Sequence, residues 1–473
     1  MPDILEMTLF ELVEAVKCGE IERDEPFEAY IERIKKVNSD YNAYITINER
    51  GRSSGAGILE GAPIAIKDCI CTKGIRTTCA SKILSGYVPP YDATVVTRIK
   101  AEGGAITGKT NMDEFAMGSS TENSGFFPSL NPWDRNRVPG GSSGGSAVAV
   151  SARMAVAALG SDTGGSVRCP ASFCGLVGIK PTYGLVSRYG LVAYANSLEQ
   201  IGPLTRNVRD CALMLNTIGG YDPRDSTSIP RRAEDYLKYL EMEVKGIRIG
   251  VPQDFFGDGT DPKVEKAVWD GIHALEGLGA TYEETSLPSL KYALPAYYII
   301  AMSEASSNLA RFDGIRYGTR EDDEGMNWEE SFSRTRGRNF GSEVKRRIIL
   351  GTFALSSGYY EEYYLKALKA RTLIRMDFQR LFKDFDILVG PTMPTPAFRI
   401  GEKTEDPLTM YMSDIDTVSI NLAGIPAISV PCGFADGLPV GMQIMAPPLG
   451  EGRLIRAAKG VEEELRLDLR PPI

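Results

Sequence analysis

Two serines lie in glycine-rich frames that could carry out acyl-transfer chemistry. Ser142 lies in the run GGSSGGS at 140–146, and Ser166 ends the run GSDTGGS at 160–166. Glycine lets the backbone approach a substrate closely, and it lets successive N–H groups point at one developing negative charge. The sequence therefore predicts a serine nucleophile beside an oxyanion hole.

A serine nucleophile needs a base, and the chain has a single histidine to offer. That residue, His273, lies in an ordinary amphipathic helical pattern. Lys67 is the alternative, because it follows the apolar run 64–66 at the end of a predicted strand. To act as a base, its pKa must fall from about 10.4 to about 7, a bias of roughly 4–5 kcal/mol. A lysine that extends its ammonium to solvent would show the same pattern.

The first frame does not match a phosphate loop, and the second frame does not match a hydrolase elbow. The Gly-Lys-Ser/Thr ending of a phosphate loop is absent, and Ser166 is followed by Val167 and Arg168 instead of the elbow's glycine. A turn whose successive N–H groups point at one place explains the second frame better. We therefore assign the predicted oxyanion hole to the backbone of Thr163, Gly164, Gly165 and Ser166.

The elements that must position these residues alternate between strands and helices. Continuous apolar strands between helices indicate an α/β fold whose sheet is covered by helices on both faces. A helical pair is expected within 1–40, a core at 60–220, and a helical cap over one edge of the sheet and the site at about 290–385. No linker divides the chain, so we expect one domain over 1–473. Strands are expected at 62–68, 105–109, 154–159, 176–179, 247–251, 386–389 and 427–430, and helices at 8–19, 26–36, 94–102, 146–153, 208–218 and 262–278.

Composition argues against several classes of protein. A net charge of −9 and a pI near 5.1 oppose extensive nucleic-acid binding. A basic stretch at 334–347 follows an acidic stretch at 321–324, and most of it is expected to be solvated surface. Eight scattered cysteines form no paired metal motif, so buried, reduced thiols and no metal site are expected. With neither a signal-peptide pattern nor a long apolar run, the chain is expected in the cytoplasm, away from membranes.

The motifs resemble the amidase signature family. The similarity rests on Lys67 and on the unbroken run 140–182, which ends in Gly-Ile-Lys-Pro-Thr. It implies the family's fold, with a large central mixed sheet, and a Ser-cisSer-Lys triad that hydrolyses amides. By this resemblance Ser166 is the nucleophile, Ser142 is the bridging serine after a cis peptide bond, and Lys67 is the base.

Three further segments, 303–314, 343–352 and 406–411, are similar to the glutaminase subunits of tRNA-dependent amidotransferases. The resemblance implies a glutaminase whose ammonia amidates Glu-tRNA(Gln), Asp-tRNA(Asn) or both. It also implies a B subunit that uses ATP and Mg²⁺ and contacts most of the tRNA, and a small C subunit. No cofactor is expected on this chain itself.

In that group a tyrosine, an arginine and an aspartate hold free glutamine, and they correspond here to Tyr298, Arg347 and Asp414. A guanidinium and a carboxylate suit the two charges of an amino acid. This makes Arg347 an exception within the basic stretch. A stand-alone hydrolase of small amides and a catalytically silent scaffold remain the alternative functions.

Overall fold

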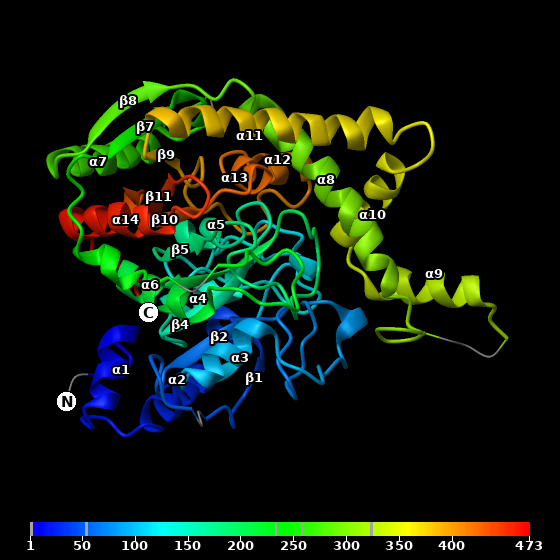
Figure 1. The fold of residues 1–473 in the computed structure, drawn as a ribbon. Coiled ribbons are helices and arrows are strands. Elements are labelled where there is room, and N and C mark those ends of the chain that lie inside the picture. The colour runs from blue at the N-terminus through cyan, green and yellow to red at the C-terminus, as the bar shows by residue number, and fades with distance from the viewer. Residues whose placement is uncertain (1–2, 53–54, 232–233, 258, 322–324) are drawn as a thin grey trace.

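One large mixed sheet forms the centre of the protein (Figure 1). The computed structural model describes residues 3–52, 55–231, 234–257, 259–321 and 325–473. Within these ranges, the sheet has 11 strands in the order β1-β3-β2-β4-β6-β5-β10-β11-β9-β7-β8. The strands are β1 (Tyr44–Ile47), β2 (Pro63–Lys67), β3 (Ala105–Thr110), β4 (Ala157–Asp162), β5 (Val177–Lys180), β6 (Gln200–Thr205), β7 (Arg248–Pro252), β8 (Thr281–Thr285), β9 (Ile387–Pro391), β10 (Ala427–Ala435) and β11 (Leu438–Met445).

The parallel part of the sheet places the chemistry-bearing strands side by side. β2 pairs in parallel with β3 and with β4, and β7 pairs in parallel with β8 and β9. The remaining pairs are antiparallel. Lys67 is the last residue of β2, as predicted, and the 160–166 frame leaves the neighbouring strand β4 at the same edge.

Helices cover both faces of this sheet. Successive residues of a strand face opposite sides. In β2, Ile64 and Ile66 join one buried cluster with the helices at 94–101 and 208–218, whereas Ala65 joins a second cluster with the helix at 144–151. The helices are α1 (Leu9–Lys17), α2 (Glu25–Tyr41), α3 (Thr94–Ala101), α4 (Gly144–Ser151), α5 (Arg168–Phe173), α6 (Val208–Ile218), α7 (Pro262–Gly277), α8 (Ala293–Asn308), α9 (Trp328–Asn339), α10 (Ser342–Ala354), α11 (Lys366–Asp384), α12 (Pro407–Met412), α13 (Val418–Ala423) and α14 (Glu451–Leu465).

Helix bounds were predicted well where the sequence contains helix-capping residues. α1 begins with a capping box of Thr8 and Glu11, and Gly19 just after its end has a positive φ of 74°. α6 has the predicted bounds, with Asn207 accepting a hydrogen bond from the backbone N–H of Asp210. α2 runs to Tyr41, five residues beyond the predicted end, because no glycine or proline stops it earlier.

One predicted strand is wrong in position. The sequence placed a strand at 154–159, but the chain turns at Arg153, which has a φ of 59°, and β4 starts at Ala157. The apolar residues before it are buried without strand pairing. The strand is set by its partners, since Ala157 pairs with Ile64 of β2 and Asp162 pairs with Gln200 of β6. As a result Ser161 and Asp162 belong to strand β4, and their side chains point to opposite faces of the sheet.

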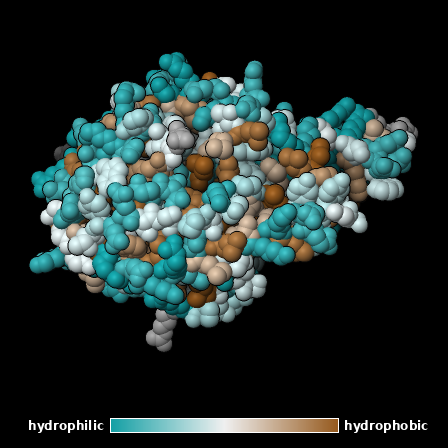
Figure 2. Space-filling model, turned by 90° about the horizontal axis from the view of Figure 1, so that it is seen from above, coloured by the Kyte–Doolittle hydropathy of each residue, from teal (hydrophilic) through white to brown (hydrophobic). Residues whose placement is uncertain are grey.

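Four long helices occur among the described residues of the range 290–385, and they divide into two parts. α8 packs against α10 and against α11, and α11 also lies against α13. α9 and the α9–α10 corner extend away from the body as an arm at the right of Figure 1. Figure 2 shows hydrophobic surface along this arm and near its junction with the body. The exposed apolar side chains include Ile349 and Phe353 of α10, at 68% and 45%.

Most of the basic stretch is paired with its surroundings. Arg338 forms an ion pair with Glu321 at 3.1 Å, and Arg336 donates to the backbone oxygens of Leu309 and Phe312. The remaining acidic residues, at 322–324, lie outside the described residues. Arg347 is buried, unlike its neighbour Arg346, whose side chain is 41% exposed.

Cysteines are free thiols, and Cys18 departs from the expectation of burial. It caps the end of α1 and is exposed, whereas the other cysteines are buried. Within the described residues, no cluster of three or more metal-ligating side chains occurs. The described helices include none that is long and apolar enough to cross a membrane.

Candidate active site

Lys67 and Ser142 meet in the buried centre of the molecule. The Lys67 Nζ lies 2.7 Å from Ser142 Oγ and 2.9 Å from Ser161 Oγ, and it donates to the backbone oxygen of Ser161 at 3.2 Å. Both Lys67 and Ser142 have no exposed surface. Lys67 is therefore a buried amine, and the interpretation in which it reaches solvent is wrong. The Gly141–Ser142 peptide bond is cis, as the resemblance implied.

Burial changes the acidity of Lys67. Desolvation lowers the pKa of its ammonium, and this effect outweighs the nearby groups that would raise it, Cys69, Asp113 and Asp162. A neutral amine within hydrogen-bond distance of a hydroxyl can accept that hydroxyl's proton. The pair is therefore chemically suited to proton transfer.

Ser166 lies at the end of a tight turn that requires glycine. A Cβ on Gly165, whose φ is 131°, would lie 2.4 Å from the Thr417 hydroxyl, and a Cβ on Gly164 would lie 2.4 Å from the Tyr297 ring. Ser166 itself keeps 7% exposure, and its backbone oxygen accepts from the N–H of Ser143 at 3.2 Å. This bond connects the two glycine-rich frames directly.

The Asp162 side chain holds that turn through hydrogen bonds to its backbone. Its carboxylate accepts from the N–H groups of Gly165, at 2.8 Å, and Val167, at 3.2 Å, and it forms an ion pair with Arg168 at 3.0 Å. Burial opposes ionisation of this carboxyl, but the Arg168 guanidinium beside it holds its pKa below the usual range. Because Gly165 N–H is engaged in this way, the turn offers fewer free donors than the four predicted for an oxyanion hole.

Arg347 lies at the centre of a second buried cluster. Its guanidinium donates to Glu343 Oε1 at 2.6 Å, to the Tyr194 hydroxyl at 2.9 Å and to the backbone oxygen of Gly118 at 2.8 Å. It also lies 5.3 Å from the ring centre of Tyr298. The guanidinium is thus held in a fixed orientation by aromatic and polar contacts.

Tyr298 and Asp414 complete this cluster. The Tyr298 hydroxyl donates to Asp414 Oδ2 at 2.7 Å, and its ring stacks on Tyr411 with 4.1 Å between centres. Burial raises the pKa of Asp414 to about 6, while hydrogen bonds from Ser119 and Tyr298 and the charge of Arg347 lower it. The structure therefore brings together Tyr298, Arg347 and Asp414, which are distant in sequence.

The two clusters are adjacent. The Thr417 hydroxyl lies 2.5 Å from the backbone oxygen of Gly164 and 3.1 Å from that of Asp414, so it joins the serine turn to the aspartate. Tyr297, next to Tyr298 on α8, packs against Gly164. The Asp414 side of the second cluster therefore lies against the Ser166 turn.

Sequence reasoning missed the supporting side chains. Ser161, Tyr194, Glu343 and Thr417 contact site residues, and Asp162 and Arg168 hold the turn. Ser161 and Asp162 lie inside the glycine-rich frame, which is a signal that could have revealed them. Arg168 lies in the run 140–182 and Glu343 in the segment 343–352, so they too were within reach of the sequence. Tyr194 and Thr417 come from segments with no motif, and only their spatial contacts reveal them.

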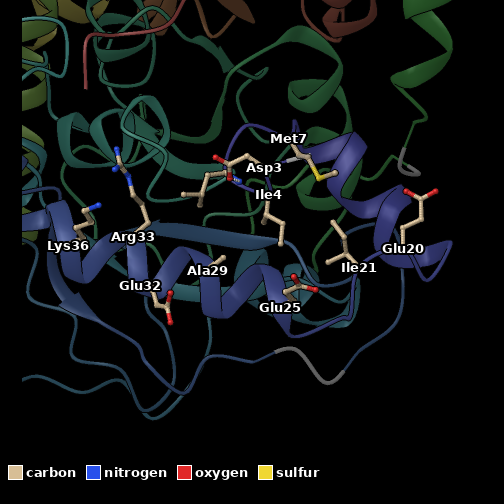
Figure 3. Close-up of a pocket in the computed structure, with 11 residues that line it drawn as sticks. Asp3, Ile4, Met7, Glu20, Ile21, Glu25, Ala29, Glu32, Arg33 and Lys36 are labelled. Atoms are coloured by element: carbon tan, nitrogen blue, oxygen red, sulfur yellow. Dashed lines mark hydrogen bonds between the residues drawn. The ribbon is translucent and has the colours of Figure 1, made fainter. Parts of the chain in front are cut away.

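Two other features lie elsewhere. His273 lies on α7, and its ring centre is 5.8 Å from that of Trp269 and 6.0 Å from that of Tyr282. A groove of about 490 Å³ lies between the N-terminal segment and α2, with Ile4, Ile21 and Arg33 among its lining residues (Figure 3). The predicted site residues do not line this groove.

Comparison with known proteins shows the family of this chain. The family model described as Amidase matches residues 25–455. The chain belongs to the amidase family. The matched range includes β2, the Ser166 turn and α10, so the elements that carry both buried clusters lie within it.

Relatives with high identity to this amidase are subunits of one kind of enzyme. The chain is 59% identical to the A subunit of glutamyl-tRNA(Gln) amidotransferase from Methanosarcina mazei, with 96% of each chain covered. It is 57% identical to the protein of the same name from Carboxydothermus hydrogenoformans, again over 96% of each. The crystal structure of the corresponding protein from Thermotoga maritima superimposes with a TM-score of 0.85 at 46% identity, covering 98% of this chain and 96% of that one.

Proposed function

We propose that this amidase is the glutaminase subunit of a tRNA-dependent amidotransferase. The observation that carries the proposal is the buried pair Arg347 and Asp414 beside the Ser166 turn. A zwitterionic amino acid offers a carboxylate to the guanidinium and an ammonium to the carboxylate. Tyr298 orients Asp414 for that contact.

The proposed reaction is hydrolysis of the glutamine side-chain amide. Ser166 Oγ attacks the amide carbon, and its proton passes through the Ser142 hydroxyl to neutral Lys67. The tetrahedral oxyanion is stabilised by backbone N–H groups of the turn. Of the predicted donors Thr163, Gly164, Gly165 and Ser166, Gly165 already donates to Asp162, so we assign the contact to the other three.

The intermediate then collapses, and the C–N bond breaks. The proton held by Lys67 returns through Ser142 to the leaving nitrogen, which departs as ammonia and leaves an acyl-enzyme ester on Ser166. Water, deprotonated by the same relay, attacks the ester and releases glutamate. Ser166 recovers its proton, so the enzyme is regenerated without a cofactor on this chain.

In the proposed assembly the ammonia is used on a partner. A B subunit would activate the aminoacyl end of the tRNA with ATP and Mg²⁺ and bind most of the tRNA, and a small C subunit would join the two in the cytoplasm. The relatives' names support Glu-tRNA(Gln) as the acceptor. Asp-tRNA(Asn) is the second acceptor that we propose to test. The acidic net charge of −9 suits a protein that leaves tRNA binding to its partner.

The alternative is a stand-alone hydrolase of small amides. The 6-aminohexanoate cyclic dimer hydrolase superimposes with a TM-score of 0.85 at 27% identity, so the fold serves such enzymes too. A neutral amide, however, offers no carboxylate to Arg347 and no ammonium to Asp414, so it would use neither of these buried charged groups.

The test uses the chain co-expressed with candidate B and C subunits. Ser166→Ala should abolish release of glutamate from glutamine while leaving assembly intact. Amidation of Glu-tRNA(Gln) or Asp-tRNA(Asn) driven by ammonium chloride should survive, because that step occurs on the partner. Near-normal glutamate release by the variant would show that Ser166 is not the nucleophile. Full turnover of simple amides, with no response of the glutaminase to partners, would favour the stand-alone hydrolase.

A further inference from the structure

Residues 113–121, which we call the strap, lie between the catalytic serines and the Arg347 cluster. At one end, Asp113 N–H donates to the backbone oxygen of Ser142 at 3.3 Å. The Asp113 carboxylate accepts from the N–H groups of Thr121, at 2.8 Å, and Asn123, at 3.1 Å. This end of the strap is therefore attached to the residue that contacts Lys67.

The next residue, Glu114, points toward a different element. Its Oε2 accepts from the N–H of Gly341 at 2.8 Å, and its Oε1 accepts from the Ser81 hydroxyl. Gly341 is the N-cap of α10, the helix that carries Arg347. A carboxylate at a helix N-terminus pairs with unsatisfied N–H groups and with the positive end of the helix dipole. Glu114 is only 2% exposed, so this contact is shielded from water.

The strap touches α10 and its surroundings at two further points. The Phe115 ring packs on Phe340, which ends α9 just before Gly341, with 5.8 Å between centres. The backbone oxygen of Gly118 accepts from Arg347 itself at 2.8 Å. One short segment therefore holds both the start of α10 and the guanidinium on its second turn.

The backbone of the strap is shaped for these contacts. Phe115 and Ala116 have φ values of 49° and 62°, which non-glycine residues rarely adopt. Such conformations persist only where the surroundings enforce them, and they concentrate at functional sites. Asp113 itself has extended backbone, so its side chain and that of Glu114 point apart and attach to two separate parts of the site. The reversal at Phe115 and Ala116 follows them.

We propose that Glu114 is a positioning residue for substrate recognition: it fixes the start of α10 and thereby sets the distance from Arg347 to Ser166. The inference rests on the proposed function, because it takes Arg347 as the group that binds the glutamine carboxylate. Glu114 touches neither substrate nor the reacting atoms. Its role is to hold α10, the helix whose Arg347 side chain binds the substrate.

The test measures glutamine hydrolysis by the assembled complex and glutamine binding by the full chain carrying Ser166→Ala. Glu114→Ala should raise KM and the dissociation constant for glutamine by about tenfold or more, with kcat at saturating glutamine within about threefold of the parent. Glu114→Gln keeps the size of the side chain and should shift both constants in the same direction by a smaller factor. Loss of general stability would instead lower kcat through the active fraction and leave KM unchanged.

Glu122→Ala is the matched control. Glu122 lies just beyond the strap and accepts from the backbone N–H of Gly401, away from α10, so its removal should leave both constants near those of the parent. Arg347→Ala is measured in parallel. If it leaves glutamine binding unchanged, the proposed function fails. If it weakens binding while both Glu114 variants bind glutamine like the parent, or lower kcat alone, the positioning role of Glu114 is overturned and the proposed function stands.

Discussion

At the scale of single residues, the site depends on the Lys67 amine, which is shielded from water. Lys67 has no exposed surface, and its Nζ lies 2.7 Å from the hydroxyl of Ser142. Its lowered pKa follows from desolvation first of all. The same contacts would serve equally well for a lysine that only supplied a fixed charge, and the two roles can be separated by substitution.

Lys67→Arg should be nearly as damaging as Lys67→Ala for glutamine hydrolysis. Arginine keeps the positive charge but does not release its proton in a protein. Loss of a general base typically costs about 10²–10⁴-fold in rate, so kcat should fall by that order in both variants. Steady-state glutaminase assays check this, with circular dichroism to confirm folding. Substantial activity in the arginine variant would assign Lys67 a purely electrostatic role.

Asp414 predicts how glutamine binding depends on pH. Its pKa is raised to about 6 by burial, so the carboxylate is present above that pH and is lost as the pH falls through it. Protonation removes the partner of the glutamine ammonium, and the dissociation constant should rise up to about tenfold for each pH unit below 6. Calorimetry on the Ser166→Ala chain between about pH 5 and pH 8 measures this. Asp414→Asn should bind weakly with little of this dependence. A parent chain whose affinity stays constant down to pH 5 would remove Asp414 from the ammonium site.

At the scale of elements, the turn between β4 and α5 carries the nucleophile, and glycine is a steric requirement there. Gly165→Ala would place a Cβ 2.4 Å from the Thr417 hydroxyl and hold alanine at a φ of 131°. We expect kcat to fall by about 10²–10³-fold, the usual effect of a displaced oxyanion donor. Stability should fall by about 1–3 kcal/mol.

Gly246→Ala separates backbone strain from the steric clash. Gly246 also has a positive φ, 82°, but a Cβ there meets nothing within 4 Å. It should cost stability in a thermal unfolding scan and leave kcat near that of the parent. Equal activity losses for both variants would mean that general destabilisation, and not the turn, explains the effect of Gly165→Ala.

At the scale of the whole molecule, the sequence predicts local chemistry better than long-range assembly. The position of Lys67 at a strand end and the bounds of α6 followed from periodicity and caps. The cis bond before Ser142 followed from the resemblance. These features depend on a few neighbouring residues, which a sequence displays directly.

What could not be predicted depends on pairing partners. β1, β6, β8 and β11 were not predicted, and β4 was misplaced because its register comes from β2 and β6. Helix α14 was also missed, although its sequence is amphipathic. Likewise, Tyr194 supports Arg347 only because α10 packs where it does. Glu343, in contrast, lies four residues before Arg347 on the same helix, a spacing that the sequence displays directly. The arm formed by α9 was expected as part of a cap, and no periodicity distinguishes a helix that covers a sheet from one that extends beyond it (Figure 1).

The burial of Arg347 and Asp414 also determines how the enzyme should respond to ionic strength. These residues are only 1% and 4% exposed, so mobile counter-ions cannot surround their side chains. Screening acts over a Debye length of about 8 Å in physiological salt, but it weakens interactions chiefly between charges in contact with solvent. KM for glutamine should therefore change less than about twofold between roughly 50 and 500 mM potassium chloride. A steep rise in KM over that range would place the charges that recognise glutamine in solvent. An enzyme with such buried charges would bind a zwitterionic substrate with similar affinity at very different cellular salt concentrations.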